Sequence, residues 1–121
     1  MRKRYKLVRI CNDKFLSANS YSFAPFYPVT LEYKVGEVTE CEHQGVACYK
    51  TLKYADVKDH IDETMKTFNK GNPIAVIELE PVGKPVFRDS RYGKNQVYAG
   101  GVNYRAVKVL RVIRVIKNDK T

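Results

Sequence analysis

The sequence predicts a single α+β domain over residues 1–121, in which a mostly antiparallel sheet of five to seven strands packs against one main helix at about 52–70. Three observations predict this fold class. Short Val/Ile-rich segments are bounded by turn residues, one longer segment has the apolar spacing of a helix, and 121 residues are enough for one hydrophobic core.

The first and last predicted strands are the most clearly defined. Residues 4–10 are rich in apolar side chains and end at the turn signal Asn12-Asp13. The last strand covers residues 104–116, and four Val and two Ile fall within its last ten positions. A strand of thirteen residues is long, so we expect a bend or bulge within it. Shorter strands are expected at residues 30–35, 46–49, 74–80 and 96–99.

One segment has the periodicity of an amphipathic helix. Its apolar residues recur at intervals of three and four and share one face: Tyr54, Val57, Ile61, Met65 and Phe68. Gly71-Asn72-Pro73 ends the segment, because glycine accepts a left-handed cap and proline cannot continue the helical hydrogen bonds. We therefore expect the helix at about 52–70 to cover one face of the sheet.

Positive charge is concentrated in the last third of the chain. Residues 84–117 hold nine basic side chains and one acid, Asp89, so this stretch carries +8 of the formal net charge of +9. A basic protein of this kind favours an anionic partner. The expected partner is nucleic acid, a nucleotide or an acidic protein surface, and the oligomeric state stays open.

The candidate anion contacts fall in a predicted loop and on the last strand. The loop contributes cations spaced to touch successive phosphates and a tyrosine that can stack on a base: Arg88, Arg91, Tyr92 and Lys94. The strand adds Arg105, Arg111 and Arg114. The alternative is that the strand cations only keep the outer face of the sheet solvated.

An aromatic segment offers a second kind of contact surface. Residues 15–28 interleave aromatic residues with Ser, Asn and two prolines, which predicts an irregular loop packed on the domain. Its candidate partner-binding residues are Tyr21, Phe23, Phe26 and Tyr27. With these residues the protein would be an inhibitor that binds another protein.

The cysteines and histidines give no standard site. Cys41, His43 and Cys48, with Cys11 or His60, are the right ligand types for zinc, but the Cys-x-His-x4-Cys spacing matches no standard zinc knuckle. Nothing in the spacing favours a Cys-His nucleophile either. We therefore expect no metal and no cofactor.

The cellular setting follows from composition. Three cysteines without framework spacing suit a reducing compartment. No apolar run is long enough to span a bilayer, and no apolar segment follows the basic residues near the start. We expect a cytoplasmic protein with no membrane partner.

One order of residues resembles a known enzyme family. Arg9, then Ser20-Tyr-Ser22, then Glu78-Leu-Glu80 resembles the Arg/Ser/Glu pattern of ADP-ribosyltransferases. The resemblance implies that Arg9, Ser20 and Ser22 hold NAD and that Glu80 orients its ribose. The alternative reading is that strand alternation places both acids on one solvated face.

A wider resemblance is to small uncharacterised proteins of phages and large viruses. It is carried by Tyr33-Lys-Val-Gly36, Cys41 to Gly45, Lys50-Thr51 ahead of Ala55, and the Arg-Ala-Val-Lys-Val-Leu run at residues 105–110. It implies a counter-defence or host-takeover factor in the host cytoplasm. The leading prediction is a small basic non-enzymatic binding protein that engages an anionic partner.

Overall fold

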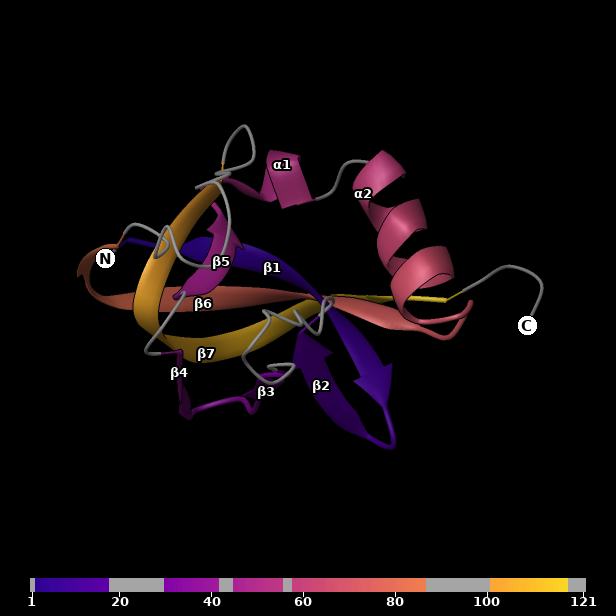
Figure 1. Ribbon diagram of the computed structural model, residues 1–121, viewed down its shortest axis with the longest axis horizontal. Coiled ribbons are helices and arrows are strands. Elements are labelled where there is room, and N and C mark those ends of the chain that lie inside the picture. The colour runs from indigo at the N-terminus through magenta and orange to yellow at the C-terminus, as the bar shows by residue number, and fades with distance from the viewer. Residues whose placement is uncertain (1, 18–29, 42–44, 56–57, 87–100, 118–121) are drawn as a thin grey trace, which may run out of the picture.

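The structure is a computed structural model that describes residues 2–17, 30–41, 45–55, 58–86 and 101–117 (Figure 1). Within these residues it contains a seven-stranded sheet in which every pair of neighbouring strands is antiparallel. The strands are β1 Arg4–Cys11, β2 Lys14–Ser17, β3 Glu32–Tyr33, β4 Val38–Glu40, β5 Val46–Tyr49, β6 Ile74–Pro85 and β7 Gly101–Ile116. The helical segments are α1 Leu52–Ala55, α2 Lys58–Asp62 and the π-helix η1 Glu63–Phe68.

The sheet closes on itself. β1 pairs with β6, β6 pairs with β7 along most of its length, β7 pairs with β5, and β5 returns to β1 where Tyr5 lies opposite Tyr49. β2 and β3 extend the sheet from the second half of β1, and β4 pairs with β7. The turn between β3 and β4 also meets β7, because Gly36 and Glu37 exchange backbone hydrogen bonds with Val109. Closure leaves the inner face of the strands shielded on all sides.

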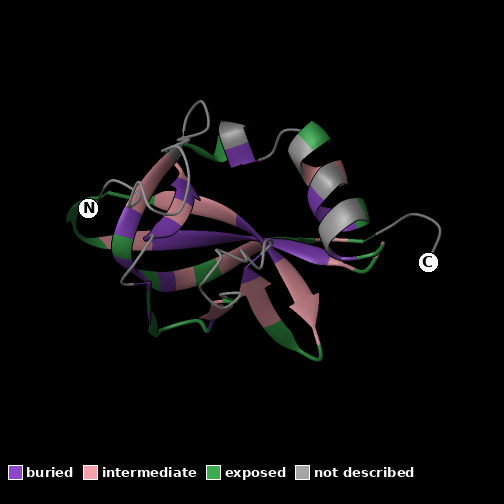
Figure 2. Cartoon of the chain, viewed as in Figure 1, coloured by how far each residue is buried: buried purple, intermediate pink, exposed green. Residues whose placement is uncertain are grey.

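Buried residues occur along the strands and in the helical segments (Figure 2). They form two hydrophobic clusters, one on each face of this closed sheet. The inner cluster draws on β1, β3, β5, β6 and β7, and Ile77, Leu79 and Val109 within it are fully buried. The outer cluster joins Leu7, Ile74 and Val76 of the sheet to Ala55 and Met65 of the helical segments. Alternation along β6 therefore sends residues 75, 77 and 79 inward and residues 74 and 76 toward the helical layer.

The prediction of an α+β domain with one main helix at about 52–70 is wrong. In the described part of the chain, the helical residues fall into pieces of four, five and six residues, and the last piece is a π-helix. Of the predicted apolar face, Met65 belongs to the outer cluster and Ile61 packs against it, and these two residues come from different pieces, η1 and α2. Such segments depend on packing more than on propensity, and Thr, Asp and His are weak helix formers.

Some of the predicted strands are confirmed, and others are incomplete or were missed. Residues 4–10, 46–49 and 74–80 do form strands, although β6 continues through Pro81 to Pro85. The extension tolerates its prolines because β1 pairs with β6 only as far as Leu79. Beyond Leu79 β6 has no β1 neighbour on that side, so the N–H groups that proline lacks are not needed for pairing there. β2 and β4 were not predicted, β3 is shorter than expected, and residues 96–99 are outside the described residues.

The predicted irregularity in the last strand is confirmed. β7 has 16 residues, and its pairing with β6 shifts register between Val76 and Ile77 and between Glu78 and Leu79. At these two shifts β7 contains one residue more than β6, whereas at a third shift, between Val82 and Pro85, the additional residue is in β6. As a result the cations Lys108, Arg111 and Arg114, three residues apart, lie opposite Glu80, Glu78 and Val76, which are two residues apart. All three cations are exposed.

Candidate functional site

Strand register gathers cations at one end of the closed sheet. β1 begins at this end, β5 and β6 finish there, and β7 starts there, because Arg4 pairs with Leu79, Pro85 with Tyr104 and Tyr49 with Gly101. We call it the basic end, and it is the left side of Figure 1. Its cations are Arg2, Lys3, Arg4, Lys50, Lys84 and Arg105. All of these residues are exposed except Arg4, which is half-buried.

Arg4 and Lys6 are inward-facing residues of β1 at this end, and we call them the inner pair. They precede Val8 on the same side of the strand, and Val8 is fully buried in the inner cluster. Arg4 Nε donates a hydrogen bond of 3.0 Å to the Tyr104 hydroxyl, and its guanidinium carbon is 5.7 Å from the centre of that ring. Both cations are half-buried as residues, so part of each stays within reach of solvent.

The Lys6 ammonium lies among apolar and neutral groups. Its Nζ donates a hydrogen bond of 2.6 Å to the backbone oxygen of Ala47 and lies 5.8 Å from the centre of the Tyr33 ring. Burial lowers the pKa of Lys6, and the thiols of Cys48 and Cys41 oppose this only in part. No ion pair of Lys6 with a carboxylate is present among the described residues.

The inner cluster contains two further polar groups next to Lys6. The Tyr33 hydroxyl is buried and has no hydrogen-bond partner within the described part of the chain, and burial raises the pKa of Tyr33 well above its usual value. Burial also raises the pKa of the Cys48 thiol to about 11. Cys48 is therefore a neutral thiol at pH 7, which removes it as a nucleophile.

The structure separates the strand cations that the sequence grouped together. Arg105 belongs to the basic end. Arg111 instead donates to Glu78 at 3.2 Å, and Lys3 approaches the same carboxylate at 3.6 Å. Glu78 is nearly buried, with 5% of its side chain exposed, and the hydrogen bond from Arg111 is the main reason that its pKa is lowered. Arg114 lies farther along β7, opposite Val76.

The residues that resemble an ADP-ribosyltransferase pattern are not brought together where they are described. Arg9 pairs with Ile74 at the start of β6, whereas Glu80 is six positions farther along, about 20 Å away at the rise of a strand. Arg9 Nε donates to the backbone oxygen of Ser17, and Glu78 is held by Arg111. Ser20 and Ser22 are outside the described residues.

Two other predicted contact segments also lie outside the described residues. The first holds the loop cations and tyrosine, Arg88, Arg91, Tyr92 and Lys94. The second holds the aromatic candidates Tyr21, Phe23, Phe26 and Tyr27. The residues that flank the first segment, Val86 and Gly101, are at the basic end, and Val86 donates its backbone N–H to Asn103. The predictions for both segments stay predictions.

The described residues contain no group of three or more His, Cys, Asp and Glu side chains that could hold a metal ion. His43 and the side chain of His60 are not among the described groups. The three cysteines Cys11, Cys41 and Cys48 are free thiols. Within the part of the chain that the structure describes, none of the helices has the length and apolar content needed to cross a bilayer.

The inner pair and Tyr33 were missed by the sequence reasoning. Arg2, Lys3, Arg4 and Lys6 looked like one basic cluster in front of a strand. The available signal was alternation, because Arg4, Lys6 and Val8 occupy every second position and so must share one face of the strand. If Val8 faces the core, both cations face inward with it.

Comparisons with known proteins add no relative to this description. No protein-family model, no curated protein and no solved structure matches the chain. The candidate site accordingly consists of the basic end, the inner pair of Arg4 and Lys6, and the buried hydroxyl of Tyr33.

Proposed function

We propose that this protein is a small basic non-enzymatic binding protein that holds nucleic acid at the basic end of the closed sheet. The observation that supports this is the convergence of cations from different parts of the chain. The exposed side chains of Arg2 and Lys3 come from the residues just before β1, Lys84 comes from β6 and Arg105 from β7, and these segments meet at this end. Cations gathered from separate strands on one surface match the repeated charges of a phosphate backbone.

Two carboxylates lie beside the basic end, but its net charge stays positive. Glu40 pairs with Ala106 on β4, and Glu80 pairs with Lys108 on β6, so both are beside the basic end. The cations of this end outnumber them. Nucleic acid is favoured over an acidic protein surface. Contacts with phosphates need only positive charge and hydrogen-bond donors at regular spacing. A protein interface also has an apolar core, and the described part of this end has no large exposed apolar residues other than Val82 and Val86.

Binding to a labelled single-stranded oligonucleotide across a salt series tests the proposal. Four phosphate contacts predict a slope of about −2.8 for log K against log salt, or roughly a 50-fold loss of affinity between 50 and 200 mM salt. The double variant Lys84→Glu/Arg105→Glu removes two of these contacts. It should lower the affinity at low salt by at least tenfold and bring the slope to about −1.4.

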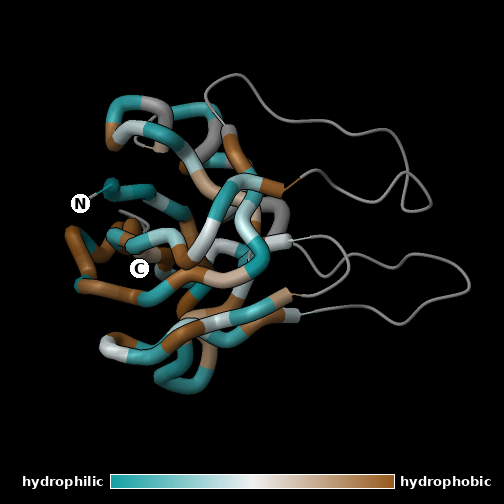
Figure 3. Tube along the Cα trace, turned by 90° about the vertical axis from the view of Figure 1, so that its left-hand side faces the viewer, coloured by the Kyte–Doolittle hydropathy of each residue, from teal (hydrophilic) through white to brown (hydrophobic). Residues whose placement is uncertain are grey.

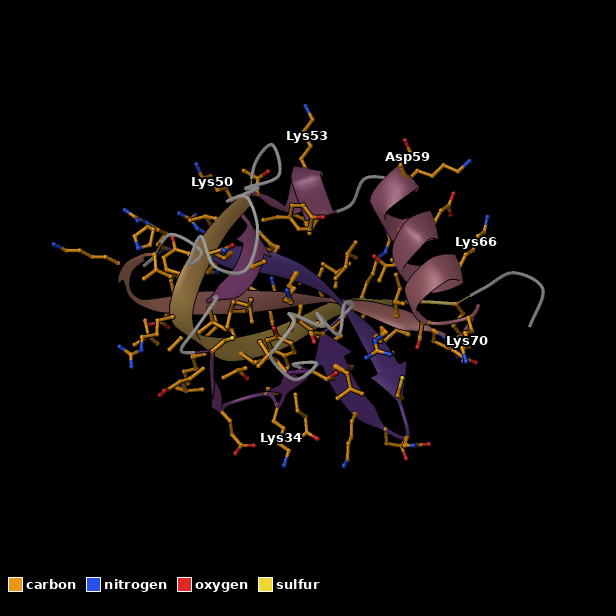
Figure 4. The ribbon with its side chains drawn as sticks, viewed as in Figure 1. Lys34, Lys50, Lys53, Asp59, Lys66 and Lys70 are labelled. Atoms are coloured by element: carbon orange, nitrogen blue, oxygen red, sulfur yellow. The ribbon has the colours of Figure 1, made fainter. Side chains whose placement is uncertain are left out.

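A matched control separates this end from general basicity. Lys66 and Lys70 are exposed lysines on the side of the molecule away from the basic end (Figure 4), so Lys66→Glu/Lys70→Glu makes the same change in net charge. The control should bind nearly as well as the unaltered protein. Equal losses in the two double variants, or a salt slope near zero, would contradict the proposal.

A further inference from the structure

The interior of the closed sheet contains positive charge without a matching carboxylate. Arg4 and Lys6 face inward from β1, and the inner hydrophobic cluster around them contains only apolar residues, two tyrosines and two cysteines. The nearest acid along β6, Glu78, is paired with Arg111 and Lys3 on the outer side. A buried cation without a counter-ion is costly, so the folded protein has to neutralise it or pair it with something.

The spare polar groups of this interior are hydrogen-bond donors. Lys6 has three N–H groups and donates one of them to the backbone oxygen of Ala47. Arg4 donates from Nε to the Tyr104 hydroxyl and from Nη1 to the backbone oxygen of Lys3. The Tyr33 hydroxyl has no partner within the described residues, although buried hydroxyls are nearly always bonded. Neither cation can accept a hydrogen bond. The group that complements such a set is an anion with several acceptor oxygens.

Deprotonation of Lys6 alone does not resolve the imbalance. A neutral Lys6 would leave the guanidinium of Arg4, which stays charged in proteins, next to Tyr104 with N–H groups to spare. It would also leave the Tyr33 hydroxyl unbonded. An anion bound at the inner pair would supply hydrogen-bond acceptors to Arg4, to Lys6 and to the Tyr33 hydroxyl, and it would offset the positive charge. Such a ligand would approach from the basic end, because Arg4 is only half-buried and lies at the end of the closed sheet.

We propose that the inner pair, with the Tyr33 hydroxyl, binds a terminal phosphate monoester carried by a nucleotide or by the end of a nucleic-acid strand. A monoester has three free oxygens and one attachment, so it can enter the interior end-on. A phosphodiester within a chain is attached on two sides and would have to bring both inside. The inference rests on the proposed function and deepens it, since the exposed cations of the basic end lie at the same end of the sheet as Arg4 (Figure 3 shows the hydrophilic start of β1 at this end).

Two oligonucleotides of one sequence, with a 5′-phosphate and with a 5′-hydroxyl, test the inference on the unaltered protein. The phosphorylated strand should bind at least tenfold more tightly. Lys6→Met should abolish this preference and keep the salt-dependent binding, and Tyr33→Phe should weaken the preference. Lys66→Met, which removes a lysine far from the site, should keep it. Far-UV circular dichroism establishes that each variant is folded.

The outcomes separate the inference from the proposed function. Equal, salt-dependent binding of both strands overturns the terminal-phosphate site and leaves nucleic-acid binding in place. Binding of neither strand overturns the proposed function. In that case a nucleoside monophosphate decides the inference, which holds if the mononucleotide raises the Tm of the unaltered protein but not of Lys6→Met, and fails if it raises neither.

Discussion

Replacement of Lys6 by methionine should make the protein more stable in the absence of ligand. Methionine has nearly the length and volume of lysine and carries no charge. The substitution removes an ammonium that lies in the interior of the closed sheet and is paired with no carboxylate among the described residues. It also removes the hydrogen bond to the backbone oxygen of Ala47. The net effect depends on which of these two changes is larger.

The two contributions have opposite signs. Burying an unpaired ion costs several kcal/mol after relaxation, and this cost disappears in Lys6→Met. Leaving the oxygen of Ala47 without its donor costs about 1–3 kcal/mol. The difference favours the variant by about 2 kcal/mol at pH 7, and a domain of this size should then show a Tm higher by about 8 °C.

The pH dependence distinguishes this explanation from a general packing gain. Burial lowers the pKa of Lys6 below its value of 10.5 in the unfolded chain. The penalty is therefore complete below the folded-state pKa, falls as the pH rises through it, and is absent above 10.5. The advantage of Lys6→Met should shrink as the pH rises in that window.

Urea unfolding of both proteins in phosphate-free buffer, from pH 6 to pH 10, measures this difference. Phosphate has to be absent, because a bound anion would stabilise the unaltered protein alone. A variant that is less stable than the unaltered protein by more than about 1 kcal/mol, with the same difference at every pH, would refute the reasoning. It would mean that Lys6 is a well-compensated structural residue.

Three further predictions concern other parts of the fold. Glu78→Gln should flatten the acid limb of the stability profile, because the lowered pKa of Glu78 stabilises the fold above about 4.5 and this stabilisation is lost as the pH falls through the folded-state pKa. Gly45→Ala should destabilise the protein more than Gly36→Ala. Both glycines have positive φ, at a cost of about 1–2 kcal/mol for alanine, but only at Gly45 would an added Cβ meet a side-chain atom at 3.1 Å. Cys48 should resist iodoacetamide at pH 7.5 until urea is added, because its pKa is about 11 and it is buried.

Each of these has a result that contradicts it. For Glu78, the contradiction is an acid limb that is the same in the variant and the unaltered protein when unfolding is followed from pH 2 to pH 7. For the glycines, it is an equal loss of unfolding free energy at both positions. For Cys48, it is modification in the native protein at the rate of a free thiol, read by mass spectrometry of peptides.

The strands could be predicted from sequence where local composition decides them. Residues 4–10 are rich in apolar residues and form most of β1, and residues 104–116 are rich in β-branched residues and form most of β7. The expected bulge in β7 also followed from local information, because a strand of thirteen residues is long and long strands often contain a bend or bulge. The closure of the sheet could not be predicted, since it depends on pairing β1 with β6, which lie about 70 residues apart.

In the helical layer, by contrast, the apolar spacing was taken to indicate one continuous helix, which the structure does not contain. Of the predicted apolar face, Ile61 and Met65 do pack toward the sheet from a helical region. Periodicity does not show whether the region is one continuous helix, because two short segments with the same spacing bury the same residues. The described segments end at Ala55, Asp62 and Phe68, and packing on β1 and β6 decides where each lies.

The positive charge of the candidate site could be predicted from the sequence, but its position in the fold could not. The basic charge, and from it the expectation of an anionic partner, came from composition, and Arg105 was among the expected contacts. The importance of Arg4 and Lys6 depends on which face of β1 is inside, and both faces of that strand carry apolar residues, Leu7 on one and Val8 on the other. Only the tertiary arrangement, with clusters on both sides of β1, shows which of the two faces is enclosed.

The two places where β7 has one residue more than β6 affect where the chain can tolerate an insertion or a deletion. Leu110 is the additional residue between the pairs of Arg111 with Glu78 and of Val109 with Leu79. Its deletion restores a regular ladder and leaves the neighbours on their present sides. Deletion of Val107, in a regular part of the strand, would turn one flank over and place buried residues in water. Single-residue insertions and deletions in homologous sequences should therefore concentrate at the two bulges, and a three-residue spacing of cations in a strand is a mark by which such bulges can be found.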